Sequence, residues 1–288
     1  MKLAELVAEL DAYFRVPDVR GDDWTRVFEQ VYPEPYWRDY VVPGWEERWN
    51  GLSVRGAEEV LNAATCVFPS DRIVESLEPG AFLFAEHPVD FADAPGFLPL
   101  SRDTFEAMRG NGISFYNVHA PLDMHPEVSP SRLCAVGVGL EGLVEYFPIC
   151  EGIDGGAAIL GESRLSVDGL ADALRSYLGS EIKVHVLTRA RGEAGRVAMV
   201  AGGGAQVEIL EASLELGCAT YVTGNAATTC VIEAVQEEVA VFRRRADEAG
   251  VTLIDATHYG MEKPPQLAMA RWFERRGLPA RFMPDGPK

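Results

Sequence analysis

Three short apolar runs, each followed by histidine and carboxylate side chains, constrain the fold of this chain more than any other feature. The runs are residues 81–85, 113–118 and 251–254. The polar side chains that follow them are Glu86, His87, His119, Asp123, His258 and Glu262. Short apolar runs bounded by turn residues are typical of buried strands, and open α/β sheets bind ligands at the carboxyl ends of their strands. We therefore expect the three strands to lie side by side and to bring these six side chains together.

Converging imidazole and carboxylate groups are typical of a metal site, because both bind divalent cations. A single histidine after a strand is more often a surface or capping residue than a functional one. Three of the five histidines of the chain occupy such a position, which weakens this ordinary explanation. The pattern alone leaves a shared metal site and unrelated surface histidines about equally favoured.

His258 and Glu262 are expected on a loop, because Gly260 and the pair Pro264 and Pro265 interrupt the sequence after the third run. Proline is favoured in the first turn of a helix and disfavoured in its interior. The last helix is therefore predicted to begin near residue 265. The imidazole and the carboxylate, four residues apart, would then extend from a turn at the end of a strand.

Strand-like runs alternate with helical segments along most of the chain, and this alternation predicts an α/β fold. Helices are predicted at residues 2–14, 57–65, 71–78, 131–141, 167–178, 205–216, 227–249 and 265–276. Further strands are predicted at residues 184–187, 196–201 and 218–222. Ser166 is expected to cap the helix that Gly179 ends.

Aromatic residues crowd the segment between residues 21 and 50. They are Trp24, Tyr32, Tyr36, Trp37, Tyr40, Trp45 and Trp49. One interpretation is an aromatic lid or an oligomer contact. The other, which we favour, is an irregular segment pinned to the surface by its rings.

A glycine-rich turn at residues 202–204 lies between a predicted strand and a predicted helix. This geometry can offer backbone N–H groups to an anion, and tight packing of the turn is an equally favoured explanation. The two remaining histidines are expected outside any site: His125 in a solvated turn, and His185 on the exposed face of a strand.

The acidic balance of the chain excludes some partners. A net charge of −18 and a pI of about 4.7 disfavour binding to nucleic-acid backbones and to anionic membranes. One small anionic substrate remains compatible, since bound dications reverse the local field. The five scattered cysteines form no Cys-x-x-Cys pair, and no apolar run has the length of a signal core or a membrane span. We therefore expect thiols rather than disulfides and a cytoplasmic protein.

Six short motifs occur in an order that is more specific than any one of them. They are Trp49-Asn-Gly-Leu52, Phe84-Ala-Glu86-His87-Pro88, Asn117-Val-His119-Ala-Pro-Leu-Asp123, Ala201-Gly-Gly-Gly204, Thr223-Gly224-Asn225 and Leu253-Ile-Asp-Ala-Thr-His258-Tyr-Gly-Met-Glu262. In this order and spacing they resemble the Nif-three-like family (NGG-one-interacting factor three), whose members are often labelled GTP cyclohydrolase 1 type 2 homologues. The resemblance covers nearly the whole chain from about Trp49.

The resemblance implies mixed sheets with flanking helices, arranged as two similar α/β lobes around a dinuclear metal site, and a homo-hexameric assembly. The lobes would comprise about residues 49–125 plus 195–288, and residues 126–194, after an N-terminal helix and aromatic-rich segment at residues 1–48. The implied ligands of two divalent ions (Zn, Mn, Fe or Mg) are Glu86, His87, Asp123, His258 and Glu262. His119 would lie at the edge of the centre, where it could orient a water, join the metals or act as the catalytic residue that transfers a proton.

The sequence departs from the family pattern in three ways. Glu86 replaces the first histidine of the family's His-His-Pro motif, which gives a harder ligand set of three carboxylates and two imidazoles. Asn225 stands where the family commonly has glutamate, and Cys230 stands near a common histidine, so the groups that handle a substrate differ. The aromatic segment at residues 21–48 is an addition.

The leading hypothesis is a metal-dependent hydrolase with a small, nucleotide-like substrate, in which Asp123 or Glu262 bridges two ions and a bound water attacks. The alternative is a non-catalytic metal-binding or protein-interaction assembly protein, which the departures at Glu86 and Asn225 favour. An enzyme that binds a cofactor at the glycine turn is a distant third, because no acidic partner for a ribose is placed for it.

Overall fold

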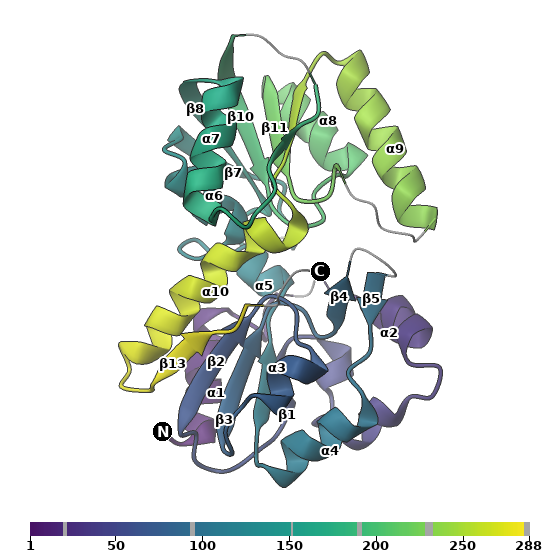
Figure 1. Cartoon of the computed structure of the whole chain (residues 1–288), viewed down its shortest axis with the longest axis vertical. Helices are drawn as coiled ribbons and strands as arrows, with labels where there is room; N and C mark the ends of the chain where they lie inside the picture. The colour runs from purple at the N-terminus through teal and green to yellow at the C-terminus, as the bar shows by residue number, and fades with distance from the viewer. Residues whose placement is uncertain (20–21, 93–95, 151, 189–191, 228–232, 285–288) are drawn as a thin grey trace. The chain divides into compact units, whose positions relative to one another are not determined.

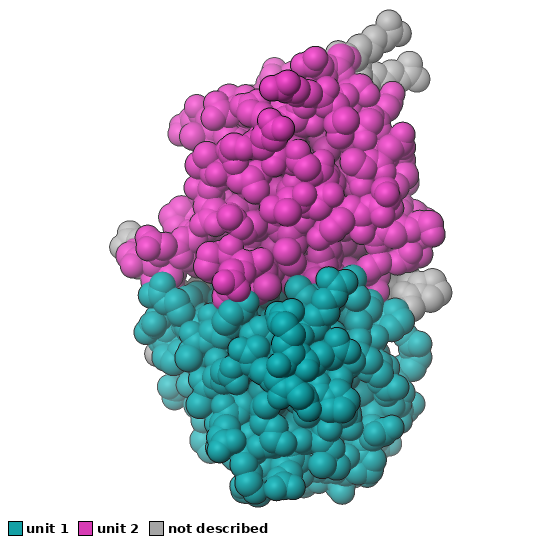
Figure 2. Space-filling view, turned by 90° about the vertical axis from the view of Figure 1, so that its left-hand side faces the viewer, with its two compact units in different colours: residues 1–122, 266–288 teal, residues 123–265 magenta. Residues whose placement is uncertain are grey.

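A computed structural model describes the chain apart from residues 20–21, 93–95, 151, 189–191, 228–232 and 285–288. The chain forms two compact units, which Figure 2 shows in different colours. Unit 1 comprises residues 1–122 and 266–288, and unit 2 comprises residues 123–265. The chain passes from one unit to the other within two helices, α5 (Ala120–Asp123) and α10 (His258–Glu274).

Unit 1 is built on a five-stranded sheet in the order β1-β6-β3-β2-β13 (Figure 1). The strands are β1 (Gly51–Val54), β2 (Asn62–Cys66), β3 (Ala81–Ala85), β6 (Ser114–Asn117) and β13 (Ala280–Phe282). Neighbouring strands are parallel except β1 and β6. A small hairpin, β4 (Asp90–Ala92) with β5 (Gly96–Leu98), lies outside this sheet. The helix predicted at residues 57–65 is wrong, because the alanines there form β2 between two parallel neighbours, and burial overrides their helical propensity.

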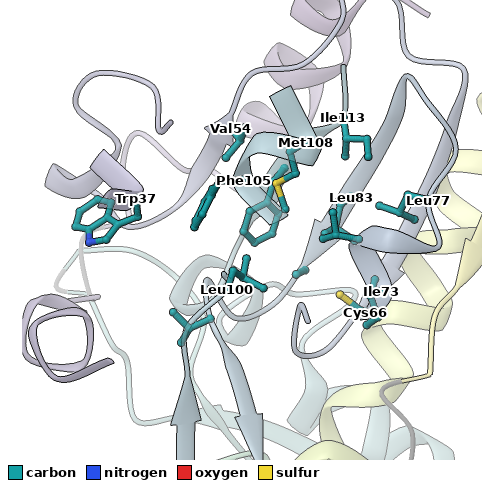
Figure 3. Packing of buried hydrophobic residues seen from close by; sticks show 14 of the residues in the cluster. Trp37, Val54, Cys66, Ile73, Leu77, Leu83, Leu100, Phe105, Met108 and Ile113 are labelled. Atoms are coloured by element: carbon teal, nitrogen blue, oxygen red, sulfur yellow. The ribbon is translucent and has the colours of Figure 1, made fainter. Parts of the chain in front are cut away.

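Alternate side chains of this sheet enter two apolar layers, as the period of two in a strand requires. Leu83 and Phe115 belong to the layer covered by α3 (Asp71–Glu75) and α4 (Arg102–Gly110), part of which Figure 3 shows. Phe84 faces the other layer, where its ring lies 5.7 Å from Phe14 and 5.9 Å from Phe273. Phe14 follows α1 (Leu3–Tyr13), and Phe273 lies in the part of α10 that belongs to unit 1.

The aromatic segment forms part of the core of unit 1. It contains α2 (Thr25–Val31) and two 3-10 helices, Tyr36–Asp39 and Trp45–Glu47. The rings of Trp24, Phe28, Tyr32, Trp37, Trp45 and Trp49 are at most 7% exposed. The indole N–H of Trp45 donates to Asn117 Oδ1 at 3.0 Å, which ties the segment to β6. The rings therefore anchor the segment, as the favoured interpretation predicted, and residues 1–48 do not stand apart from the α/β fold.

We expect Trp45→Phe to lower the free energy of unfolding by about 2 kcal/mol. The change leaves the buried Asn117 Oδ1 without its N–H donor, which costs roughly 1–3 kcal/mol, and it removes part of a fully buried side chain. Urea unfolding followed by circular dichroism measures the difference. Leu61→Ala is the control in the same unit, because Leu61 is 60% exposed and should shift stability by about 0.5 kcal/mol at most. Equal stabilities of the two variants would contradict the role given to Trp45.

Unit 2 is built on a six-stranded sheet in the order β7-β8-β10-β11-β12-β9. The strands are β7 (Glu141–Tyr146), β8 (Ala158–Ser166), β9 (His185–Val186), β10 (Glu193–Val200), β11 (Thr220–Thr223) and β12 (Thr252–Asp255). The central strands β10, β11 and β12 are parallel, and the other pairs are antiparallel. Because β10 pairs with both β8 and β11, residues 195–265 form one unit with residues 126–194, and the lobes differ from those predicted.

Helices cover both faces of the second sheet (Figure 1). They are α6 (Pro130–Gly137) and α7 (Val167–Leu178) on one face, and α8 (Val207–Glu215) and α9 (Glu233–Glu248) on the other. Val222 and Ile254 belong to the first apolar layer, and their neighbours Tyr221 and Leu253 belong to the second. Ser166 Oγ accepts from Gly169 N–H at 3.1 Å, so the predicted cap of α7 is confirmed.

The prediction that the three strands before the candidate ligands lie side by side is wrong for the third strand. β3 and β6 are neighbours in unit 1, whereas β12 pairs with β11 and β9 in unit 2. All three runs are short, apolar and buried, and nothing in such a run specifies which of two sheets it joins. Among the described residues, no helix combines the length and the apolar character needed to cross a bilayer.

Candidate metal centre

Unit 1 carries Glu86, His87 and His119 just beyond the carboxyl ends of β3 and β6. The two strands are parallel neighbours, with Ala85 opposite Asn117, so the residues that follow them meet at one edge of the sheet. Glu86 and His87 are buried, and the rings of His87 and His119 have centroids 5.0 Å apart. The prediction that these two strands lie side by side is confirmed, and it brings His87 and His119 together.

Packing and backbone hydrogen bonds hold Glu86 and His87 in place. Their N–H groups donate to the carbonyls of Cys66 and Val67, at 3.4 and 3.2 Å, and so extend the pairing of β3 with β2. The His87 ring stacks on Phe68 with centroids 4.3 Å apart. Glu86 Oε2 accepts from the side-chain amide of Gln266 at 3.4 Å. Both side chains are therefore fixed before any ligand arrives.

Asp22, which the sequence did not single out, holds His119. Its Oδ1 lies 2.7 Å from His119 Nδ1, and its Oδ2 accepts from Ala120 N–H at 3.0 Å and from the Asn50 amide at 2.6 Å. Asn50 Oδ1 in turn accepts from His119 N–H at 2.7 Å. Burial raises the pKa of the Asp22 carboxyl, but the charge and hydrogen bond of His119, with those from Asn50 and Ala120, outweigh it and hold the pKa below its usual range.

Trp24, like Asp22, belongs to the aromatic segment and contacts the histidines at the carboxyl ends of β3 and β6. Its ring meets His87 and His119 edge-on, with centroids 5.7 and 5.2 Å away. The crowding of aromatic and acidic residues in the segment was visible in the sequence. No periodicity connects Asp22 or Trp24 with a histidine almost a hundred residues later, so their partner was not predictable.

Unit 2 carries His258 and Glu262 on the first turns of α10. The pair is spaced i, i+4, which places both side chains on one face of a helix, and His258 Nε2 lies 2.9 Å from Glu262 Oε1. The His258 side chain is 18% exposed and that of Glu262 is 4% exposed. The prediction that they extend from a loop is therefore wrong.

The early start of α10 has a local cause. Thr257 Oγ1 accepts from Gly260 N–H at 3.1 Å, which is the bond of a helix N-cap. Pro265 has no N–H, so it cannot donate the helical hydrogen bond to the Met261 carbonyl. The thiol of Cys134 donates to this carbonyl instead, with Sγ 3.4 Å from the oxygen. The helix therefore passes through Pro264 and Pro265.

Asp255 fixes the backbone just before His258. Its carboxylate accepts from Thr257 N–H at 3.0 Å and from Ala227 N–H at 2.9 Å, so it joins two loops at the end of the sheet. Burial raises the pKa of Asp255 even though both N–H groups favour its charged form. Thr257 has a φ of +61°, which is rare for a β-branched residue and costs of order 1–3 kcal/mol. This strained backbone lies directly before the candidate ligand His258.

The glycine-rich turn leaves room for the His258–Glu262 pair. A Cβ on Gly202 would lie 2.0 Å from Glu262 Oε1 and 3.3 Å from His258 Nε2, and one on Gly224 would lie 2.8 Å from His258 Cα. The Asn225 side-chain oxygen accepts from Ala205 N–H at 2.8 Å, which joins this turn to the loop after β11. These contacts favour tight packing over an anion cradle as the reason for the glycines.

The remaining candidates have different surroundings. Asp123 ends α5 and is partly exposed. His125 is 7% exposed, and its Nδ1 accepts hydrogen bonds from the N–H groups of Glu127 and Val128. The prediction that His125 lies in a solvated turn is therefore wrong. His185 is exposed, as predicted. Cys230 lies outside the described residues.

The donors of each unit suit a divalent cation. Imidazole nitrogens and carboxylate oxygens bind Zn, Mn, Fe and Mg. Two ligand atoms that meet an ion at about 2.1 Å and at right angles lie roughly 3.0 Å apart, and the His258 and Glu262 atoms are 2.9 Å apart. The pair thus has the spacing of two ligands of one ion.

Fold and donor sets together define a class of α/β protein with two sheet-based units and histidine–carboxylate clusters beyond the strands. The chain belongs to the Duf34/NIF3 (NGG1p interacting factor 3) family, whose model matches residues 22–282. The predicted family is therefore confirmed.

Relatives and solved structures extend this result. The Escherichia coli K12 protein named GTP cyclohydrolase 1 type 2 homolog is 26% identical to this chain, and the match covers 77% of this chain and 83% of the relative. The Deinococcus radiodurans protein of the same name is 28% identical, and the match covers 81% of this chain and 84% of the relative. The solved protein ybgI matches with a TM-score of 0.70 and 22% identity over 100% of this chain and 99% of its own. HcgD from Methanocaldococcus jannaschii matches with a TM-score of 0.67 and 16% identity over 98% and 97%. The mixed α/β NIF3 fold thus extends across the whole chain.

Proposed function

We propose that this chain is a metal-dependent hydrolase with a dinuclear centre and a small, nucleotide-like substrate. The observation that carries the proposal is that each unit holds its own histidine–carboxylate set, the buried Glu86 and His87 in unit 1 and the partly exposed His258 with the buried Glu262 in unit 2. Relatives bear the name GTP cyclohydrolase 1 type 2 homolog, so ring-opening hydrolysis of GTP is the first reaction to test.

The proposed ligands of two divalent ions (Zn, Mn, Fe or Mg) are Glu86, His87, Asp123, His258 and Glu262. Bound ions would lower the pKa of a water molecule and polarise the bond under attack. Asp123 or Glu262 would bridge the two ions, and Gln266 would orient the Glu86 carboxylate through its 3.4 Å contact. His119 would transfer the proton, since imidazole titrates near neutral pH. We extend the proposal to a homo-hexamer located in the cytoplasm.

A second candidate function is a non-catalytic metal-binding or protein-interaction assembly protein. Two substitutions favour it. Glu86 stands where the family motif begins with histidine, and Asn225 stands where glutamate is common. The oxygen of Asn225 accepts from Ala205 N–H, which engages it in holding the turn rather than a substrate.

Metal content per chain, compared between wild type and Glu86→Ala, tests the proposed centre. We expect two ions per chain in the wild type and one in the variant, because Glu86 contributes a buried carboxylate. Hydrolysis of a nucleotide and phosphoester panel, with and without Zn²⁺ or Mn²⁺, then separates the two functions. One ion or none, unchanged in the variant, would contradict the dinuclear centre. Two ions without hydrolysis of any compound would favour the assembly protein.

A further inference from the structure

His119 is held from three sides, by Asp22 and Trp24 of the aromatic segment and by Asn50 of the first motif. Asp22 lies 2.7 Å from its ring nitrogen Nδ1, Asn50 accepts from its backbone N–H, and the edge of Trp24 packs against its ring. The Asp22 side chain is 5% exposed, so water does not compete effectively for its oxygens. A histidine with this many fixed neighbours is held in one ring orientation.

The partners of Asp22 determine which nitrogen of His119 carries hydrogen. An ionised carboxylate only accepts hydrogen bonds, and a neutral imidazole has one donor nitrogen and one acceptor nitrogen. Asp22 Oδ2 accepts from two N–H donors, Ala120 N–H at 3.0 Å and the Asn50 amide at 2.6 Å, and these bonds favour the ionised carboxylate. The nitrogen that faces Asp22 must therefore be N–H.

We propose that Asp22 is a positioning residue that fixes neutral His119 as the Nδ1–H tautomer and presents Nε2 as its acceptor nitrogen. This inference rests on the proposed function, since it gives Nε2 the proton transfer assigned to His119. Histidine in water prefers the Nε2–H tautomer, so the carboxylate reverses the ordinary preference. Carboxylate–histidine pairs act in the same way beside metal sites and in hydrolytic triads, where the carboxylate sets tautomer and orientation.

The surroundings of Asp22 make Asp22→Asn a sharp test. Asp22 Oδ2 accepts from two donors, Ala120 N–H and the Asn50 amide, so an asparagine keeps its oxygen there. Its NH₂ group then occupies the position of Oδ1 and points at His119 Nδ1. A donor at that position requires Nδ1 to accept, so the near-isosteric change should invert the tautomer to Nε2–H.

Nuclear magnetic resonance of the full chain, labelled with ¹⁵N-histidine and loaded with Zn²⁺, measures the tautomer at a pH where the imidazole is neutral. The His119 signals are assigned by their loss in His119→Gln. We expect Nδ1–H in the wild type and Nε2–H in Asp22→Asn. Asp23→Asn is the matched control, because Asp23 is exposed and its carboxylate accepts a hydrogen bond from its neighbour Thr25. This variant should keep Nδ1–H.

Nε2–H in the wild type would overturn the inference, and this result does not depend on whether Asp22→Asn folds. Where a hydrolytic substrate is found, kcat should fall on the order of 10- to 100-fold in Asp22→Asn, with metal content unchanged. An Nδ1–H wild type without hydrolytic activity would count against the proposed function and support the positioning. Activity together with an Nε2–H wild type would support the function and refute the positioning.

Discussion

His258→Ala is expected to reduce the affinity of the chain for Zn²⁺ and Mn²⁺ by more than the roughly 10- to 100-fold that loss of an outer hydrogen bond costs. The imidazole would be a direct ligand, and its Nε2 lies 2.9 Å from Glu262 Oε1, the spacing of two ligands of one ion. Removal of the ring leaves Glu262 as the one donor of this pair. Competition with a chromophoric chelator measures the affinity, and elemental analysis of the purified protein measures the content.

Metal-linked stability provides a second test of the same substitution. An ion that binds the folded chain raises its free energy of unfolding by RT ln(1 + [L]/Kd), and the melting temperature rises with it. Added Zn²⁺ should therefore raise the melting temperature of the wild type by more than that of His258→Ala, which keeps the other four proposed ligands. His185→Ala is the control, because His185 is exposed on β9 of the same unit and should keep the full response. Unchanged metal affinity in His258→Ala would remove His258 from the proposed ligands.

The sequence predicted that the candidate metal ligands follow buried strands, but it did not predict correctly which strands lie side by side. Glu86, His87 and His119 lie where the apolar runs placed them, because β3 and β6 are consecutive strands of the first sheet and pair in parallel, with the β4–β5 hairpin and α4 between them along the chain. Such neighbours in sequence are usually neighbours in a sheet. β12 comes much later in the chain, and its apolar run contains no information about which strands it pairs with.

The start of α10 was missed because two local rules disagree there. The prolines at 264 and 265 predicted a helix boundary, whereas in the structure Thr257 caps the helix and starts it earlier. Thr257 has a left-handed backbone, which its residue type does not indicate, and it is held by Asp255. The tertiary contact from Cys134 to the Met261 carbonyl then reduces the cost of the prolines.

Asp22 shows the limit of reading motifs from a single chain. It is 97 residues from His119, and its role depends on a side-chain hydrogen bond that has no period and no spacing rule. The aromatic crowding did indicate a packed segment, because large rings are rarely left in water. That packing brings Asp22 and Trp24 to the edge of β3 and β6 and makes the aromatic segment part of the site. The family model matches the chain from residue 22, so the prediction that this segment is an addition to the family is wrong.

Gly202→Ala is expected to weaken Zn²⁺ binding by about 10- to 100-fold while the fold is retained. The new Cβ would lie 2.0 Å from Glu262 Oε1, so the carboxylate must rotate away from His258 Nε2. Glu262 is 4% exposed, which leaves it little room for this movement. The φ of +63° at Gly202 adds a left-handed strain of roughly 1–2 kcal/mol.

Alanine variants of two other glycines in unit 2 distinguish the effect of the steric clash with Glu262 from the effect of the left-handed backbone strain. Gly250 has a φ of +72° with nothing within 4 Å of an added Cβ, so Gly250→Ala should lose similar stability and bind Zn²⁺ normally. Gly203, beside Gly202 in the turn, also has open space around an added Cβ, so Gly203→Ala should preserve the affinity. Normal Zn²⁺ affinity in Gly202→Ala would mean that the His258–Glu262 geometry does not control metal binding. If Gly202→Ala binds Zn²⁺ weakly and both control variants bind it normally, the clash with Glu262 is the cause, because only Gly202 of the three glycines has this contact. This result would show that Gly202 leaves space for the His258–Glu262 pair.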